Sequence, residues 1–136
     1  MTLEAELLWT GERFERHPHV RDRRALLPGF VSAHSHAFQR ALRGRGETFP
    51  AGSGSFWSWR EAMYELVGQL DEERFLTEVR ATFAEMRAAG ITTVGEFHYL
   101  PELNHLVLQA AKEAGIRITL LLTYYKTGGI GQPLAP

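Results

Sequence analysis

Apolar and polar positions along this chain follow two alternating patterns, which together predict an α/β fold. Short stretches rich in β-branched and apolar residues, typical of strands, are separated by longer stretches in which apolar residues recur every three or four positions, typical of amphipathic helices. Strands that alternate with helices in this way pair in parallel through helical crossovers. The predicted strands cover residues 26–33, 91–97 and 116–124, and the predicted helices cover 37–43, 56–70, 71–89 and 101–114, after a small hairpin made of 3–9 and 13–20.

The helix predicted over residues 71–89 has the clearest pattern. Four of its apolar side chains repeat every three or four positions and form one stripe that we expect to be buried. They are Phe75, Val79, Phe83 and Met86. Asp71 is a suitable N-cap for this helix, and Gly90 is placed to end it. Gly115 ends the helix over 101–114 in the same way.

The composition narrows the classes of protein to which this chain can belong. It has 136 residues, 15 basic and 16 acidic side chains, a net charge of −1 and 44% hydrophobic residues. A nucleic-acid-binding protein needs a surplus of basic residues to neutralise phosphates, so that class is excluded. The absence of cysteine excludes disulfides, thiol nucleophiles and thiolate metal sites.

No targeting or membrane segment is expected either. The N-terminus is acidic where a secretory signal is basic. The most apolar stretch, residues 116–125, contains Arg117 and is much shorter than the roughly 20 residues of a membrane-spanning helix. We therefore expect a cytoplasmic protein with no membrane partner.

The strongest chemical signal is a pair of histidines, His34 and His36, directly after the predicted strand 26–33. Side chains two residues apart on a strand point to the same side. Both imidazoles can therefore converge beyond the carboxyl end of the strand, where parallel α/β folds place their sites. Neutral imidazole is a common ligand of zinc and iron. His17 and His19 have the same spacing, but they stand among charged residues with no buried strand beside them, and we expect them at the surface.

A catalytic zinc ion usually has three protein ligands and a water, and the pair supplies two. Glu96 and His98 share one face of the strand that begins at residue 91. Each is a candidate ligand, a candidate partner of a ligand, or a polar residue with a purely structural contact. His105 lies within a predicted helix, and we expect it at the boundary of that helix's surface.

Four blocks of sequence make the chain resemble a known family. Leu-Pro-Gly-Phe-Val-Ser-Ala-His-Ser-His at residues 27–36 resembles the first barrel strand of the amidohydrolase superfamily, whose His-x-His binds the catalytic metal. Three blocks are similar, within that superfamily, to the formimidoylglutamate deiminase family. They are His-Ser-His-Ala-Phe-Gln-Arg at 34–40, Ser-Phe-Trp-Ser-Trp-Arg-Glu at 55–61 and Glu-Phe-His-Tyr at 96–99. The resemblance extends from about residue 26 to the end of the chain.

The resemblance implies a fold and a domain organisation. A complete (β/α)8 barrel takes about 250 residues. Residues 26–136 are therefore expected to form only the N-terminal part of a metal-dependent amidohydrolase barrel, about strands one to three, and residues 1–25 a remnant of the family's small N-terminal β-domain. This β-segment is shorter than in the family, and so is the connection after Tyr99, where Pro101 follows almost at once.

The resemblance also implies a reaction. The family hydrolyses N-formimino-L-glutamate to N-formyl-L-glutamate and ammonia in histidine degradation, with one divalent metal, zinc or alternatively iron, that lowers the pKa of its bound water. By position, His34 and His36 match metal ligands, and Gln39, Arg60 and Tyr99 match residues that contact the substrate. A guanidinium pairs well with a carboxylate, which suits this dicarboxylate amidine substrate. The family's general base and its remaining ligands, a His and an Asp, belong to later strands, so no catalytic base is expected within this chain.

The resemblance carries two further expectations and leaves alternatives open. The chain alone is expected to be inactive, and the full-length protein to be a homo-oligomer. One alternative is another amidohydrolase deaminase that acts on a cyclic C–N substrate such as a nucleobase. A second is a non-catalytic chain that associates with a complementary piece. A third is a binding module built on the glycine-rich residues 128–131, although their spacing is not that of a phosphate-binding loop.

Overall fold

A computed structural model describes residues 4–45 and 54–124 of the chain. The chain divides into two compact units, Met1–Phe30 and Val31–Pro136, each of which has its own sheet. Most of the loop predicted between residues 43 and 55, and all of the glycine-rich residues 128–131, lie outside the described residues. Within the described part, no helix combines the length and the apolar character needed to cross a membrane.

The first unit is a small three-stranded sheet with the strand order β2-β1-β3. Its strands are β1 (Leu7–Trp9), β2 (Phe14–Arg16) and β3 (Ala25–Leu26). The antiparallel pairing of β1 with β2 confirms the predicted hairpin, and Trp9 packs edge-to-face on Phe14 across it with ring centroids 5.1 Å apart. His19 is exposed and His17 half-buried, in keeping with the surface position expected for that pair.

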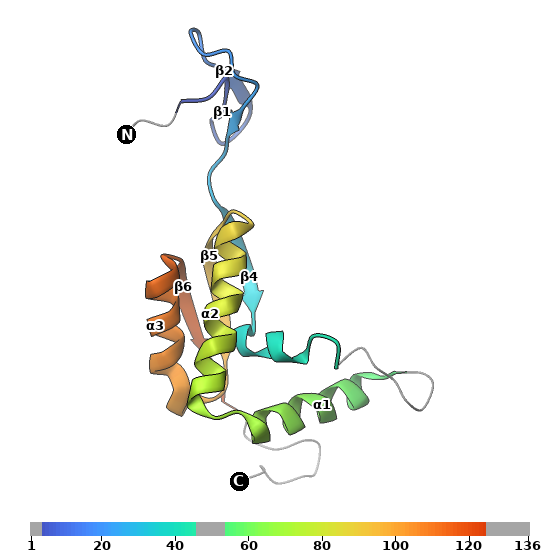
Figure 1. Cartoon of the computed structure of the whole chain (residues 1–136). Helices are drawn as coiled ribbons and strands as arrows, with labels where there is room; N and C mark the ends of the chain where they lie inside the picture. The colour runs from blue at the N-terminus through green and yellow to red at the C-terminus, as the bar shows by residue number, and fades with distance from the viewer. Residues whose placement is uncertain (1–3, 46–53, 125–136) are drawn as a thin grey trace. The chain divides into compact units, whose positions relative to one another are not determined.

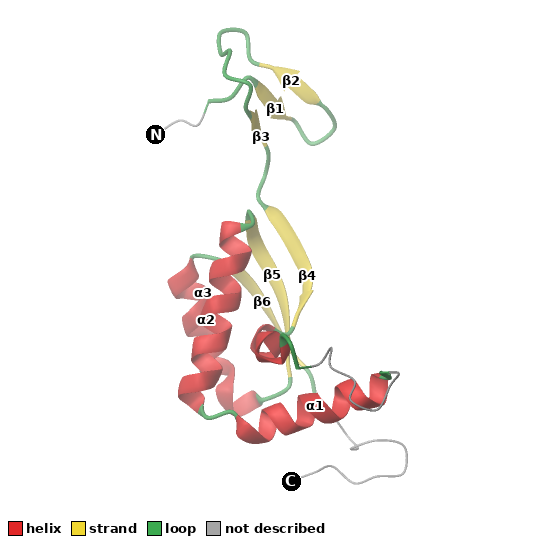
Figure 2. Ribbon diagram, turned by 45° about the vertical axis from the view of Figure 1, so that its right-hand side comes forward, coloured by secondary structure: helices red, strands yellow, loops and turns green. Residues whose placement is uncertain are grey.

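The second unit is the predicted α/β arrangement, a three-stranded sheet with the order β4-β5-β6 (Figure 1). Helices α2 and α3 lie on one side of this sheet (Figure 2). β5 and β6 are parallel, with Val94 beside Ile118. The elements are, in chain order, β4 (Phe30–Ser35), the 3-10 helix η1 (Ala37–Leu42), α1 (Phe56–Gln69), α2 (Glu72–Ala88), β5 (Ile91–His98), the 3-10 helix η2 (Pro101–Leu103), α3 (Asn104–Ala114) and β6 (Arg117–Leu122).

The core of the second unit lies between the sheet and its helices. The predicted stripe on α2 is confirmed, since three of its residues are fully buried and the fourth is partly buried against them. Phe38 of η1 stacks on Phe75 of α2, with ring centroids 5.9 Å apart. The ends of the helices also follow the prediction. The Asp71 carboxylate accepts a hydrogen bond of 2.8 Å from the Arg74 N–H, and Gly90 and Gly115 take positive φ values of 84° and 64°.

The single buried strand predicted over residues 26–33 is wrong in two respects. First, the structure has two strands here, because β3 ends at Leu26 and β4 begins at Phe30, on either side of Pro28, which has no N–H to donate to a ladder. Second, β4 is mostly exposed, with Phe30 and Val31 at 57% and 67%. β4 is an edge strand among the described strands, and only its last residue, Ser35, is buried. The apolar run therefore predicted a strand but not its burial, which depends on neighbours outside the run.

An ion-pair network ties η1 to α2. The Arg40 guanidinium contacts Glu78 at 2.9 Å and Glu85 at 2.8 Å, and Arg43 contacts the other oxygen of Glu85 at 2.6 Å. Because η1 follows His36 directly, the network anchors the segment that leaves the histidine pair.

Acid is expected to remove the stability that Glu85 contributes through this network. Hydrogen bonds from Arg43 and Arg40 lower the pKa of Glu85 from 4.5 to about 2. A carboxylate whose pKa is depressed by folding contributes stability that is fully present above its ordinary pKa and is lost as the pH falls toward the depressed one. In urea unfolding near neutral pH, Glu85→Gln should therefore have a lower free energy of unfolding than the parent chain. The difference between the two free energies should shrink steadily below about pH 4.5. Because the ion-paired side chains are exposed, high salt should also reduce this difference in stability. A difference that does not change with pH would contradict the lowered pKa of Glu85.

Candidate metal and substrate site

The predicted histidine pair lies at the carboxyl end of β4, where His34 is the last residue but one of the strand and His36 follows it. The two imidazole rings meet at a centroid distance of 4.9 Å and an interplanar angle of 86°. The ring of His34 also packs on Phe97 of β5, with centroids 4.6 Å apart. The structure thus brings the two imidazoles together on one face of the sheet, as their spacing predicted.

A hydrogen bond from β5 fixes the ring of His36. Its Nδ1 lies 2.8 Å from the carbonyl oxygen of Phe97. A carbonyl can only accept, so Nδ1 carries the proton and the lone pair of the neutral ring is on Nε2. Burial lowers the pKa of His36 and so favours the neutral ring, although the hydrogen bond to the Phe97 carbonyl opposes the shift. A neutral imidazole held through Nδ1 is the form that binds zinc through Nε2.

Gln39 and Tyr99 meet beside this pair. The Gln39 side-chain amide donates to the Tyr99 hydroxyl at 3.0 Å, and that hydroxyl lies 3.2 Å from the sulfur of Met63, to which it donates. The Tyr99 ring packs against the ring of His36 with centroids 5.7 Å apart. Two of the three predicted substrate residues therefore lie next to a predicted metal ligand, although Gln39 and Tyr99 are 60 positions apart in the chain.

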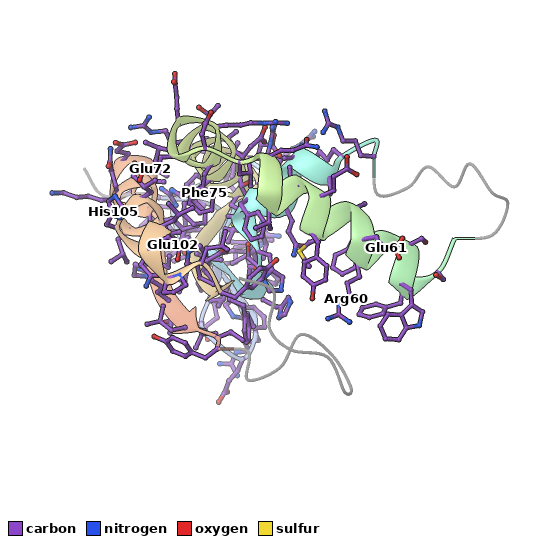
Figure 3. All side chains as sticks on the ribbon, turned by 90° about the horizontal axis from the view of Figure 1, so that it is seen from below. Arg60, Glu61, Glu72, Phe75, Glu102 and His105 are labelled. Atoms are coloured by element: carbon purple, nitrogen blue, oxygen red, sulfur yellow. The ribbon has the colours of Figure 1, made fainter. Side chains whose placement is uncertain are left out.

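Arg60 lies on α1, and two aromatic side chains of that helix hold it. Its Nε and Nη2 donate to the Tyr64 hydroxyl at 2.9 and 2.6 Å. Its guanidinium also lies over the rings of Tyr64 and Trp57, 5.0 and 5.6 Å from their centroids. Figure 3 shows Arg60 and Glu61 directed to different sides of α1. The half-buried Arg60 and the exposed Trp57 and Tyr64 form a cationic and aromatic surface.

Glu96 and His98 face the helices rather than the ring of His34. Both are 1% exposed, and they alternate along β5 with Phe97, whose ring contacts His34. The ring of His98 packs on Phe75 of α2 with centroids 5.6 Å apart, and neither of its nitrogens has a hydrogen-bond partner among the described residues. Burial lowers the pKa of His98 and raises that of Glu96. His98 therefore packs on α2 through its ring.

Glu96 reaches the histidine pair through the backbone. Its Oε1 accepts a hydrogen bond of 2.6 Å from the N–H of Ala37, the residue after His36. From α2, the Thr82 hydroxyl lies 2.8 Å from the Ala37 carbonyl. The sequence interpretation missed Thr82 and Met63. The signal for Thr82 was available, since it is a hydroxyl residue three positions after Val79 and directly before Phe83, on the buried side of α2.

The donor set fits part of a zinc site. His34 and His36 are the donor type that zinc prefers, and His36 is oriented for it. The described residues contain no group of three or more His, Cys, Asp or Glu side chains that is placed to hold a metal ion. His105 does not join the pair, because it is exposed on α3, where its Nδ1 lies 3.1 Å from the Glu102 carbonyl (Figure 3).

The sequence profile of the amidohydrolase family matches residues 25–128. Among curated proteins, the chain is 40% identical to formimidoylglutamate deiminase from Pseudomonas aeruginosa, in an alignment that covers 79% of this chain and 26% of that protein. The chain thus spans about a quarter of the length of this relative.

Solved structures show the same likeness. An amidohydrolase from Brucella melitensis superposes with a TM-score of 0.73 at 31% identity, over 91% of this chain and 31% of that one. Atrazine chlorohydrolase TrzN from Arthrobacter aurescens, solved with zinc, superposes with a TM-score of 0.61 at 22% identity, over 79% of this chain and 25% of that one. The second likeness, at so low an identity, concerns the fold alone.

Proposed function

The chain belongs to the amidohydrolase family, and on that premise we propose that the protein containing it hydrolyses N-formimino-L-glutamate to N-formyl-L-glutamate and ammonia. The observation that carries the proposal is the cluster of His34 and His36 with Gln39 and Tyr99 at the end of β4 and β5. The 40% identity to a formimidoylglutamate deiminase supports the choice of substrate.

In this proposal the two histidines provide two of the metal ligands. A zinc ion held there would supply a coordinated water of lowered pKa. His36 would bind through Nε2, since its Nδ1 hydrogen is held by the Phe97 carbonyl. The remaining ligands and the general base are proposed to lie on further strands of the same barrel.

Three side chains would hold the substrate. The amide of Gln39 and the hydroxyl of Tyr99 are already aligned by their mutual hydrogen bond, and both can bond a polar substrate. Arg60 would pair with a carboxylate of the substrate, for which its planar fork of donors is well suited. Trp57 and Tyr64 orient that fork in advance through their cation–π contacts.

The proposal is tested by measuring ammonia release from the natural-length protein, that is, the full-length protein in which the proposed further barrel strands accompany this chain. With zinc supplied, we expect turnover of N-formimino-L-glutamate and none of a neutral cyclic amidine such as a nucleobase. The 136-residue chain by itself should release no ammonia, because its described residues present two metal ligands and not three. Turnover of the nucleobase alone would favour the alternative of a cyclic-substrate deaminase. Turnover by the isolated chain would contradict the proposed division of the metal site.

Arg60→Gln is expected to raise KM for N-formimino-L-glutamate about 10- to 100-fold with a smaller effect on kcat, because a hydrogen bond to a charged group contributes about 1.5–3 kcal/mol. Steady-state kinetics of the natural-length protein measures both constants. Arg80→Gln is the matched control, since Arg80 is an exposed arginine of α2 that pairs with Glu113 at 2.6 Å. An unchanged KM in Arg60→Gln would remove Arg60 from the substrate site.

A further inference from the structure

We propose that Glu96 and Thr82 are positioning residues that clamp the backbone of Ala37 from two sides and thereby hold His36 in its metal-binding orientation. The inference rests on the proposed metal role of His34 and His36. It concerns side chains that are neither ligands nor substrate contacts in the proposed function.

The first half of the clamp comes from β5. Ala37 is 1% exposed, so its N–H is shielded from water and needs a protein acceptor. Glu96 provides it at 2.6 Å with Oε1, while Oε2 is buried with no hydrogen-bond partner among the described residues. A carboxylate buried at 1% exposure is costly. The hydrogen bond from Ala37 offsets part of this cost, and the Ser35 side chain is a second hydrogen-bond partner of the same carboxyl group.

The second half comes from α2. The Thr82 hydroxyl lies 2.8 Å from the Ala37 carbonyl and 2.9 Å from the carbonyl of Glu78 in its own helix, so its single hydrogen is shared between the two acceptors. Both polar backbone groups of Ala37 are thus bonded by side chains that lie 45 and 59 positions further along the chain.

The clamp acts on the ring of His36 through the backbone. His36 Nδ1 bonds the carbonyl of Phe97, the neighbour of Glu96 on β5. Two adjacent residues of β5 therefore hold two adjacent residues of the segment that leaves β4, one through a side chain and one through a carbonyl. If Ala37 moves, the peptide that carries His36 moves with it, and the 2.8 Å bond that fixes the ring is lost.

The test separates the hydrogen bonds from packing. Glu96→Gln retains an acceptor oxygen for Ala37, whereas Glu96→Met retains the approximate shape without one. Thr82→Val removes the hydroxyl and Thr82→Ser restores it. Thr77→Val is the matched control, because the Thr77 hydroxyl bonds only the Glu73 carbonyl of the same helix, at 2.9 Å, among the interactions of the described residues.

Three readouts apply to the full-length protein. The affinity for Zn²⁺ is measured by competition with a chelating dye. Amide hydrogen exchange at Ala37 and the ¹⁵N shifts of the His36 ring, which report its tautomer, are measured on the metal-free protein. We expect Glu96→Met to lower the zinc affinity about 10- to 100-fold, the usual cost of losing a group that orients a ligand. We also expect faster exchange at Ala37 and mixed tautomers at His36. Thr82→Val should shift the same readouts in the same direction by a smaller factor, while Glu96→Gln, Thr82→Ser and Thr77→Val stay near the parent.

The proposal is overturned if Glu96→Met and Glu96→Gln change all three readouts equally, or if neither variant changes any of them. Should Glu96→Met fail to fold, the comparison of Thr82→Val with Thr82→Ser decides in the same way. Should the parent protein bind no zinc, the proposed function fails, while the exchange and tautomer readouts still decide whether the clamp exists.

Discussion

Replacing His36 with alanine is expected to lower the zinc affinity of the natural-length protein by more than about 100-fold and to abolish ammonia release. Loss of a group that merely orients a ligand costs about 10- to 100-fold in affinity, and the loss of the ligand itself should cost more. His36 is also the better anchored of the pair, because its Nδ1 donates to the Phe97 carbonyl, whereas the ring nitrogens of His34 have no such bond in the described part of the chain.

The measurement is zinc content after dialysis, together with competition against a chelating dye and an ammonia assay. His105→Ala is the matched control, since His105 is an exposed histidine of α3 that bonds a carbonyl through the same ring nitrogen. His105→Ala should keep both zinc and activity. Zinc bound at full stoichiometry and unchanged affinity in His36→Ala would show that the pair is not part of a metal site.

The sequence predicted most of the second unit because its signals are local. The stripe on α2, the cap at Asp71 and the glycines that end α2 and α3 depend only on residues within one turn of each other, so their pattern is readable from the chain alone. The histidine pair is readable for the same reason, because residues two apart on a strand share a side whatever the strand packs against.

The contacts that complete the site could not be predicted, because they join distant segments. The bond between Gln39 and Tyr99 and that between Glu96 and Ala37 depend on which strands become neighbours. Alternation along β5 does place Glu96 and His98 on one face, but it leaves open which of them finds a partner. The exposure of β4 was unpredictable for a related reason, since an apolar strand is buried only when other elements cover it.

The close approach of β4 and β5 predicts a second large effect, the loss of stability on replacing Gly95 with alanine. A Cβ atom at Gly95 would lie 2.8 Å from the backbone oxygen of Ala33 and 3.2 Å from its carbonyl carbon. The backbone of Ala33 cannot relieve this clash by changing a rotamer, as a side chain could. Strands β4 and β5 must therefore move apart. Gly95→Ala should therefore lower the free energy of unfolding by about 1–3 kcal/mol in urea unfolding, the usual cost of overpacking.

Gly68→Ala is the matched control, and it should change the free energy of unfolding in the opposite direction. Gly68 lies in the last turn of α1, and nothing stands within 4 Å of a Cβ atom placed on it. Alanine there reduces the entropy of the unfolded chain and should raise stability by up to about 1 kcal/mol. Equal effects at the two glycines would contradict the steric explanation. Because the same strand contact sets the distance between His36 and the Phe97 carbonyl, Gly95→Ala should also weaken zinc binding, and Gly68→Ala should leave it unchanged.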